Sequence, residues 1–146
     1  MIDIQKIEEF LISADKLFPI PLSQKQNLKD FAQKLAEKAT ICTACEDGKI
    51  VSMVAGYTDN VVDGLAYISI VASLPDTQGK GYASSLIKEF IRICKQKTIN
   101  AVHLYTTKTN DVAIKMYKKL GFVEWITPNE PRPEDLHLIY YIGEKQ

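Results

Sequence analysis

Two glycines in the segment SLPDTQGKGYASSLIKEF, residues 73–90, could bring a negatively charged ligand close to the protein backbone. The first N–H groups of a helix have no partner within the helix, and the helix dipole is positive at that end. Because Gly79 and Gly81 lack side chains and helical spacing follows them, a phosphate could reach those N–H groups. The segment is typical of a phosphate or pyrophosphate site, although a Gly-x-Gly pair by itself also fits a tight turn.

The spacing of this segment excludes two familiar phosphate-binding loops. A Walker loop requires Gly-Lys followed by Ser or Thr, whereas Lys80 is followed here by Gly81. A dinucleotide fingerprint requires a third small residue, which would be Ser84, and it belongs to the first strand of a doubly wound sheet. The strand predicted before this loop lies too far along the chain for that fold.

A second group of residues that could take part in a reaction lies further along the chain. It comprises Asn110, Ala113, Tyr117, Gly121 and Phe122. A phenol has a reference pKa of about 10, so a tyrosine stays protonated at neutral pH and can donate a proton to a leaving group. On spacing alone, Tyr117 is better explained as a packed aromatic side chain on one helix face.

The elements that must position these residues follow from hydrophobic periodicity. Helices are predicted over residues 3–17, from an N-cap at Ser23 to 39, and over 81–96 and 110–120. Strands are predicted over residues 39–46, 50–57, 65–73, 101–107, 122–126 and 136–142. Pro19 and Pro21 separate the first two helices, residues 47–49 form a hairpin turn, residues 59–64 are turn-rich, and Gly121 ends the last helix.

The order of these elements predicts one α/β domain over residues 1–146, with a mixed sheet. The run LAYISIVAS is continuously apolar, which indicates a central strand covered on both faces. A strand, a helix and another strand form a βαβ unit, which implies a parallel pair between residues 65–73 and 101–107.

Charge and hydropathy exclude several classes of partner. Eighteen basic and eighteen acidic residues cancel, whereas nucleic acid or an anionic membrane requires a basic excess. No apolar run approaches the roughly 20 residues that span a bilayer, and the acidic N-terminus does not resemble a signal peptide. We therefore expect a cytoplasmic protein without nucleic-acid or membrane partners.

Three cysteines raise the alternative of a redox or metal site, because Cys42 and Cys45 form a C-x-x-C. Positions three apart on a strand face opposite sides of the sheet, which prevents both thiols from chelating one metal. We expect reduced thiols and no bound metal.

Taken together, the two motifs resemble the GNAT superfamily of N-acetyltransferases, which transfer acetyl from acetyl-CoA to an amine. The family's loop motif, Q/R-x-x-G-x-G/A, is matched by Gln78, Gly79, Lys80, Gly81, Tyr82 and Ala83. Its second motif is matched by Asn110, Ala113, Tyr117, Gly121 and Phe122. The resemblance covers about residues 65–125, and by strand order it extends back to Ile41. It implies a GNAT-like fold, with a central mixed sheet whose parallel strands splay apart.

The resemblance also implies roles for these residues. The backbone N–H groups of residues 78–83 would bind the CoA pyrophosphate, and Asn110 would hydrogen-bond the cofactor. The pantetheine arm would lie along Ile70, Val71, Ala72 and Ser73, and Tyr117 would face the sulfur. Val71 or a neighbour would polarise the thioester carbonyl through its N–H. Lys80 and Lys115 would meet phosphates or remain solvated.

The sequence departs from the family pattern in the residue that would act as the general base. The family often carries a Glu or Asp on the central strand, and AYISIVA contains neither. The alternatives are Tyr67, Glu46, Asp63, Glu124 and His103, and the sequence favours none of them. The family also commonly opens with a strand, whereas a helix is predicted first here.

The acceptor remains open at this stage. Residues 18–24 and 127–135 would flank it, and the second segment carries Glu130, Glu134 and Asp135 against Arg132. An acidic rim would favour a cationic amine, while an ordinary exposed loop explains the same residues. A small-molecule or peptide amine fits the resemblance, and a homodimer would be common for the family. A non-catalytic CoA-binding module is the alternative function.

Overall fold

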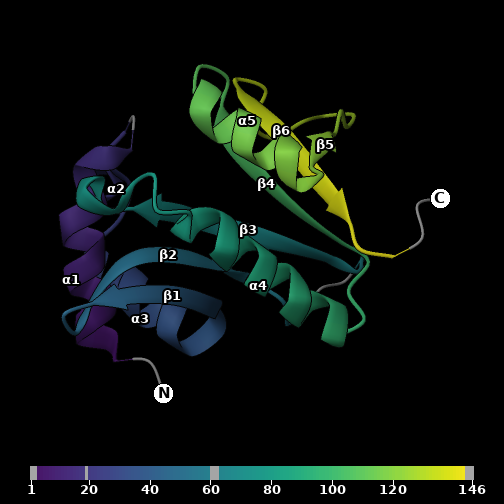
Figure 1. The fold of residues 1–146 in the computed structure, drawn as a ribbon. Coiled ribbons are helices and arrows are strands. Elements are labelled where there is room, and N and C mark those ends of the chain that lie inside the picture. Colours follow the sequence, from purple (N-terminus) through teal and green to yellow (C-terminus); the bar gives the residue numbers. More distant parts are fainter. Residues whose placement is uncertain (1–2, 19, 60–62, 144–146) are drawn as a thin grey trace.

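The described part of the chain forms one mixed sheet flanked by helices. The computed structural model describes residues 3–18, 20–59 and 63–143. The strands are β1 (Thr40–Glu46), β2 (Lys49–Tyr57), β3 (Leu65–Ser73), β4 (Ala101–Thr107), β5 (Val123–Glu124) and β6 (Asp135–Tyr141). The helices are α1 (Ile4–Ala14), α2 (Leu22–Lys25), α3 (Leu28–Lys38), α4 (Tyr82–Gln96) and α5 (Asp111–Leu120), with 3-10 turns η1 (Asp15–Leu17) and η2 (Pro75–Thr77). The strand order is β1-β2-β3-β4-β6-β5, which confirms the predicted mixed sheet (Figure 1).

Strands β3 and β4 are parallel, as the βαβ pattern predicts, and they separate soon after they meet (Figure 1). Their pairing ends at Tyr67 and His103. A bulge explains the separation: Ile68 pairs with Gly56 and Ile70 with Ala55, so Ser69 is an extra residue on β3. A bulge bends its strand and increases the local twist, which turns the rest of β3 away from β4.

The bulge also changes the face of the sheet to which the buried side chains of β3 point. Before it, Ile68 packs in a cluster with Ile87 and Phe90 of α4 and with Tyr117 of α5. After it, Ile70 packs in a cluster with α1 and α3 on the opposite face of the sheet. The two faces of the sheet are therefore covered by different helices, with α4 and α5 on one side and α1 and α3 on the other (Figure 1).

Two predicted boundaries are wrong. Ser23 does not cap a long helix: its N–H and hydroxyl donate to the Asp15 carboxylate at 2.8 and 2.6 Å, within the separate short helix α2. Helix α3 begins instead after Asn27, whose side chain accepts from the Asp30 N–H at 3.1 Å. The predicted strand 122–126 is reduced to two residues. The predictions for Pro19 and residues 60–62 lie outside the described residues.

The two thiols of the C-x-x-C lie in different environments. Cys42 is buried, Cys45 is exposed, and neither forms a disulfide. Burial raises the pKa of the Cys42 thiol to about 11, so this thiol stays protonated and is a poor nucleophile and metal ligand. Within residues 3–18, 20–59 and 63–143, no helix is long and apolar enough to cross a membrane.

Candidate active site

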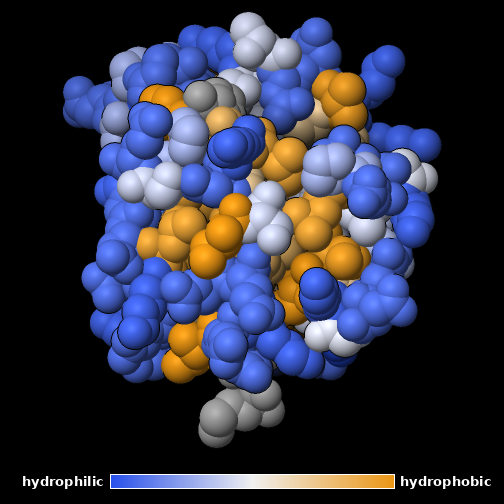
Figure 2. Space-filling view, turned by 90° about the vertical axis from the view of Figure 1, so that its left-hand side faces the viewer, coloured by the Kyte–Doolittle hydropathy of each residue, from blue (hydrophilic) through white to orange (hydrophobic). Residues whose placement is uncertain are grey.

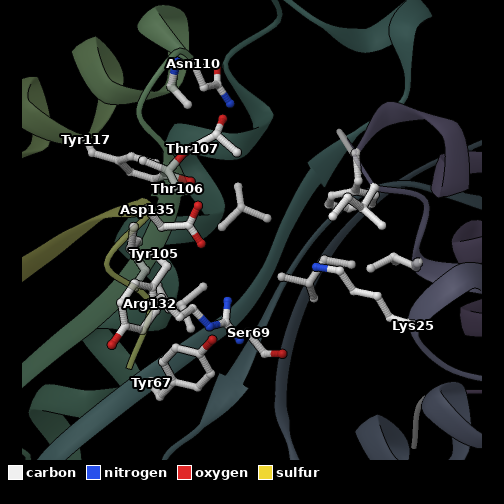
Figure 3. Close-up of a pocket in the computed structure, with 18 of the residues that line it drawn as sticks. Lys25, Tyr67, Ser69, Tyr105, Thr106, Thr107, Asn110, Tyr117, Arg132 and Asp135 are labelled. Atoms are coloured by element: carbon white, nitrogen blue, oxygen red, sulfur yellow. Dashed lines mark hydrogen bonds between the residues drawn. The ribbon is translucent and has the colours of Figure 1, made fainter. Parts of the chain in front are cut away.

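A cleft of about 440 Å³ opens where β3 and β4 diverge. One wall comes from β3 with the segment around α2, and the other comes from β4 and α5 with the segment before β6 (Figure 3). Seen from the α1 side, the surface carries islands of apolar side chains bordered by hydrophilic ones (Figure 2). A cleft of this volume is large enough for a small ligand.

The glycine loop leads from β3 into α4 with the backbone geometry that an anion site needs. Gly79 and Gly81 have φ angles of +89° and +82°, a region that side chains disfavour. The N–H groups of Gly79, Gly81, Tyr82, Ala83 and Ser84 donate to no other group in the described part of the chain. These donors sit at the positive end of a 15-residue helix, so the loop can receive a phosphate-like anion.

One carboxylate lies beside this loop. Glu46 at the end of β1 accepts from the Lys80 ammonium at 3.0 Å and from the Tyr82 hydroxyl at 2.8 Å. These two hydrogen bonds lower the pKa of Glu46, so it stays ionised. Lys80 is thus paired with Glu46 here, and Glu46 does not line the cleft as a general base would.

The edge of β3 beyond Tyr67 has no partner on β4, which leaves main-chain groups available along the cleft. Ile70 and Val71 line it directly. Ser73 lies further along and is held by its neighbours: its hydroxyl bonds Ser52 at 2.7 Å, and its carbonyl accepts from the Gln78 amide at 3.3 Å. An extended ligand could add to this edge as another strand would.

Tyr117 projects from α5 into the wall of the cleft, where the sequence pattern placed a proton donor (Figure 3). The side chain is 5% exposed and packs edge-on against Phe122 at 5.7 Å. Burial raises the pKa of its phenol to about 12. Its hydroxyl bonds no group in the described part of the chain, yet no fully buried polar side-chain atom there lacks a partner. The hydroxyl therefore keeps access to the cleft.

The ends of α5 explain the rest of the second motif. Asn110 caps the helix, its side-chain oxygen accepting from the Ala113 N–H at 3.3 Å, and its amide NH₂ remains available at the rim of the cleft. Gly121 adopts a φ of +113°, and the Phe122 N–H donates back to the Tyr117 carbonyl at 3.0 Å. This C-cap confirms the predicted helix end and fixes Tyr117 on the last turn.

The structure shows which of the candidate bases lie near the cleft. Asp63 accepts from the Leu65 N–H at 3.1 Å, and Glu124 lies exposed near Lys118, so neither reaches the cleft. Tyr67 lines the cleft, but burial raises the pKa of its phenol. His103 pairs with Tyr67 across the last β3–β4 rung, with their ring centroids 5.1 Å apart.

A polar network behind Tyr105 was missed by sequence reasoning. Glu130 accepts from the Tyr105 hydroxyl at 2.6 Å, and its other oxygen lies 2.8 Å from His137 Nδ1. His137 Nε2 lies 2.8 Å from His103 Nδ1. The Tyr105, His137 and Thr127 hydrogen bonds lower the pKa of Glu130 to about 2. Pairing of β4 with β6 creates this network, which spacing along the chain does not reveal.

The tautomers in this network follow from the ionised carboxylate. Glu130 can only accept, so neutral His137 carries its proton on Nδ1 and accepts at Nε2. His103 then donates from Nδ1, and burial together with His137 lowers the pKa of its imidazole. The network supports the part of the cleft wall that Tyr105 lines.

The comparisons with known proteins agree with this geometry. The family model of the acetyltransferase (GNAT) family matches residues 7–122. This chain therefore belongs to the GNAT acetyltransferase family, as the two motifs indicate.

Individual relatives are more distant. A mycothiol acetyltransferase from Saccharopolyspora erythraea is 38% identical over 65 residues, which cover 44% of this chain and 22% of that protein. The chain thus spans about a fifth of the length of this curated relative.

Solved structures share the fold. The ribosomal-protein-S18-alanine N-acetyltransferase from Escherichia coli matches with a TM-score of 0.75 at 21% identity, over 99% of this chain and 90% of that one. PaiA N-acetyltransferase from Thermoplasma acidophilum, in complex with coenzyme A, matches with a TM-score of 0.72 at 16% identity, over 95% and 92%. The GNAT-like acyl-CoA N-acyltransferase fold is therefore confirmed.

Proposed function

We propose that the protein is a cytoplasmic N-acetyltransferase that transfers acetyl from acetyl-CoA to a primary amine by direct attack in a ternary complex. One observation carries this proposal: unpaired N–H groups at the start of α4 and the unpaired edge of β3 are consecutive along the chain and lead to the cleft that Tyr117 lines. The anion loop, the extended edge and the proton donor match the pyrophosphate, the pantetheine arm and the thioester in that order.

The residues divide the work as follows. Within residues 78–83, the unpaired N–H groups of Gly79, Gly81, Tyr82 and Ala83 hold the pyrophosphate, whereas those of Gln78 and Lys80 donate to the Pro75 and Thr77 carbonyls at 3.3 Å. Ile70, Val71, Ala72 and Ser73 lie along the pantetheine arm. Asn110 donates its amide to the cofactor. The Val71 N–H, or that of a neighbour on the free β3 edge, polarises the carbonyl and stabilises the oxyanion of the tetrahedral intermediate.

Tyr117 acts when the intermediate collapses. The neutral amine forms the C–N bond, the C–S bond breaks, and the sulfur leaves with the bonding pair. Tyr117 donates its proton to that sulfur, which becomes a thiol. The nitrogen's proton passes to solvent, and the Tyr117 phenolate takes a proton back from solvent through the cleft. Because the pKa of Tyr117 is about 12, this phenol remains a donor throughout the neutral range.

Steady-state turnover tests this proposal. Release of the CoA thiol is followed while the concentrations of acetyl-CoA and of an amine are both varied. Lines that intersect in a double-reciprocal plot of the initial rates support a ternary complex. Parallel lines would instead indicate an acetyl-enzyme. Binding of CoA without turnover of any amine would favour the alternative of a non-catalytic CoA-binding module.

A further inference from the structure

Four charged side chains line the part of the cleft that is left for an acceptor. They are Lys25, Arg132, Glu134 and Asp135. Within the described residues, none of the four makes a side-chain hydrogen bond or an ion pair, although Lys80, Arg92 and Lys97 each do elsewhere. Two positive and two negative groups therefore line the cleft, so a purely cationic acceptor would be attracted by one pair and repelled by the other.

Of the two cations, Arg132 has a side chain that is held in place by a described contact. Its guanidinium carbon lies 5.0 Å from the centre of the Tyr105 ring. That ring is held in place, because its hydroxyl bonds Glu130 at 2.6 Å and the ring stacks on His137 at 4.1 Å and 19°. The network beneath the cleft thus holds a planar guanidinium with its N–H donors unused.

Asp135 is held close to Arg132 along the chain. Its N–H donates to the Arg132 carbonyl at 3.0 Å, and its backbone pairs with Thr107 at the start of β6. In Figure 3 both charged groups point into the cleft, with Asp135 on the side of Tyr117 and Arg132 on the side of Tyr67. The negative group is therefore nearer the expected position of the reacting sulfur, and the positive group is further from it.

On the basis of the proposed acetyl transfer, we propose that the acceptor amine carries an oxyanion, a carboxylate or a phosphate, on the same small molecule. Arg132 binds the oxyanion, and Asp135 faces the amine. A guanidinium fork fits the two oxygens of a carboxylate or phosphate, and such charge-assisted bonds are the stronger ones. Asp135 attracts the ammonium form and orients the nitrogen toward the thioester, and the ammonium releases a proton to solvent before the neutral amine attacks.

Matched pairs of acceptors test this inference. Wild type with acetyl-CoA is assayed on free L-amino acids against their carboxamides, and on phosphoethanolamine against ethanolamine, with spermidine as a third arm. We expect kcat/KM to be about 10- to 100-fold higher for the anionic member of at least one pair, mainly through KM. The pair that discriminates identifies the oxyanion as a carboxylate or a phosphate.

Variants assign the preference to a residue. Arg132→Gln should bring the ratio within the discriminating pair close to one, and Arg132→Lys should keep part of it because charge remains without the fork. Arg92→Gln, on the outer surface of α4, is the matched control and should leave both rate and ratio unchanged. Thermal unfolding midpoints of the three variants check that each is folded.

The assays distinguish failure of this inference from failure of the proposed function. Equal turnover of both members of every pair, or preferred turnover of spermidine, would overturn the inference while acetyl transfer stood. A preference that survives in Arg132→Gln would overturn the assignment to Arg132. Absence of turnover with every amine, despite CoA binding, would remove the proposed function itself and this inference with it.

Discussion

Replacing Tyr117 with Phe separates a catalytic role from a packing role. The Tyr117 hydroxyl makes no hydrogen bond within the described part of the chain, so its removal leaves no buried group without a partner. The ring and its edge-on contact with Phe122 at 5.7 Å are retained. The free energy of unfolding should therefore change by less than about 0.5 kcal/mol, which for a domain of this size moves the midpoint by no more than about 2 °C.

Activity should respond very differently to the same change. Loss of a donor to the departing sulfur should lower kcat about 10- to 1,000-fold, which corresponds to about 1.4–4 kcal/mol of transition-state stabilisation. KM for acetyl-CoA should change little, because the ground state needs no proton from this residue. Thiol release by wild type and variant is compared under saturating acetyl-CoA, together with thermal unfolding of both.

The control is Tyr140→Phe, whose ring also packs against Phe122, at 5.5 Å, and does not line the cleft. It also removes one phenolic hydroxyl and should keep full activity. Wild-type kcat in Tyr117→Phe would refute the reasoning and leave Tyr117 as a packed aromatic side chain. Equal losses in both variants would show that the effect comes from packing.

Three further predictions follow from the contacts around the site. Glu46→Gln removes a carboxylate beside the loop and releases Lys80, so the Kd for CoA should fall several-fold at low salt by calorimetry; weaker binding would contradict an anion site there. His103 and Glu130 both have a lower pKa in the folded state, so the unfolded state binds more protons, and stability should fall as pH drops below about 6.5 and again from about 4.5 toward 2. Urea unfolding midpoints measured against pH test this prediction. His103→Gln should remove the loss of stability below about pH 6.5, and a loss that persists in this variant would refute its assignment to His103. Cys45→Ser should leave CoA-thiol release unchanged, whereas a loss would revive the redox alternative.

Local chemistry made much of the fold predictable. Gly121 ends α5 because only a residue tolerant of positive φ fits there, and such a stop can be read from one letter after a periodic run. The parallel pairing of β3 with β4 follows from a strand, a helix and a strand in succession. The anion loop is equally local, because its donors belong to consecutive residues.

The remaining features depend on partners distant in sequence. The Asp15 carboxylate accepts a hydrogen bond from the Ser23 N–H across a loop, so Ser23, the predicted N-cap, belongs to a short separate helix. The bulge at Ser69 is set by register against β2 rather than by the letters of β3. His103 and His137 meet only because β4 pairs with β6, and neither histidine carries a local signal of that contact.

Binding of CoA is the most direct test of the account. Thermal unfolding is measured with acetyl-CoA, CoA and ATP for wild type, for Gly81→Glu and for Gln96→Glu, which adds the same charge at the other end of α4. At 100 times its Kd, a ligand of the folded state should add about 2.7 kcal/mol of stability. We predict a clear stabilisation by both CoA species but not by ATP, retained in Gln96→Glu and lost in Gly81→Glu. No stabilisation of wild type by either CoA species would mean that the glycine loop is only a turn, and the acetyltransferase proposal would fall.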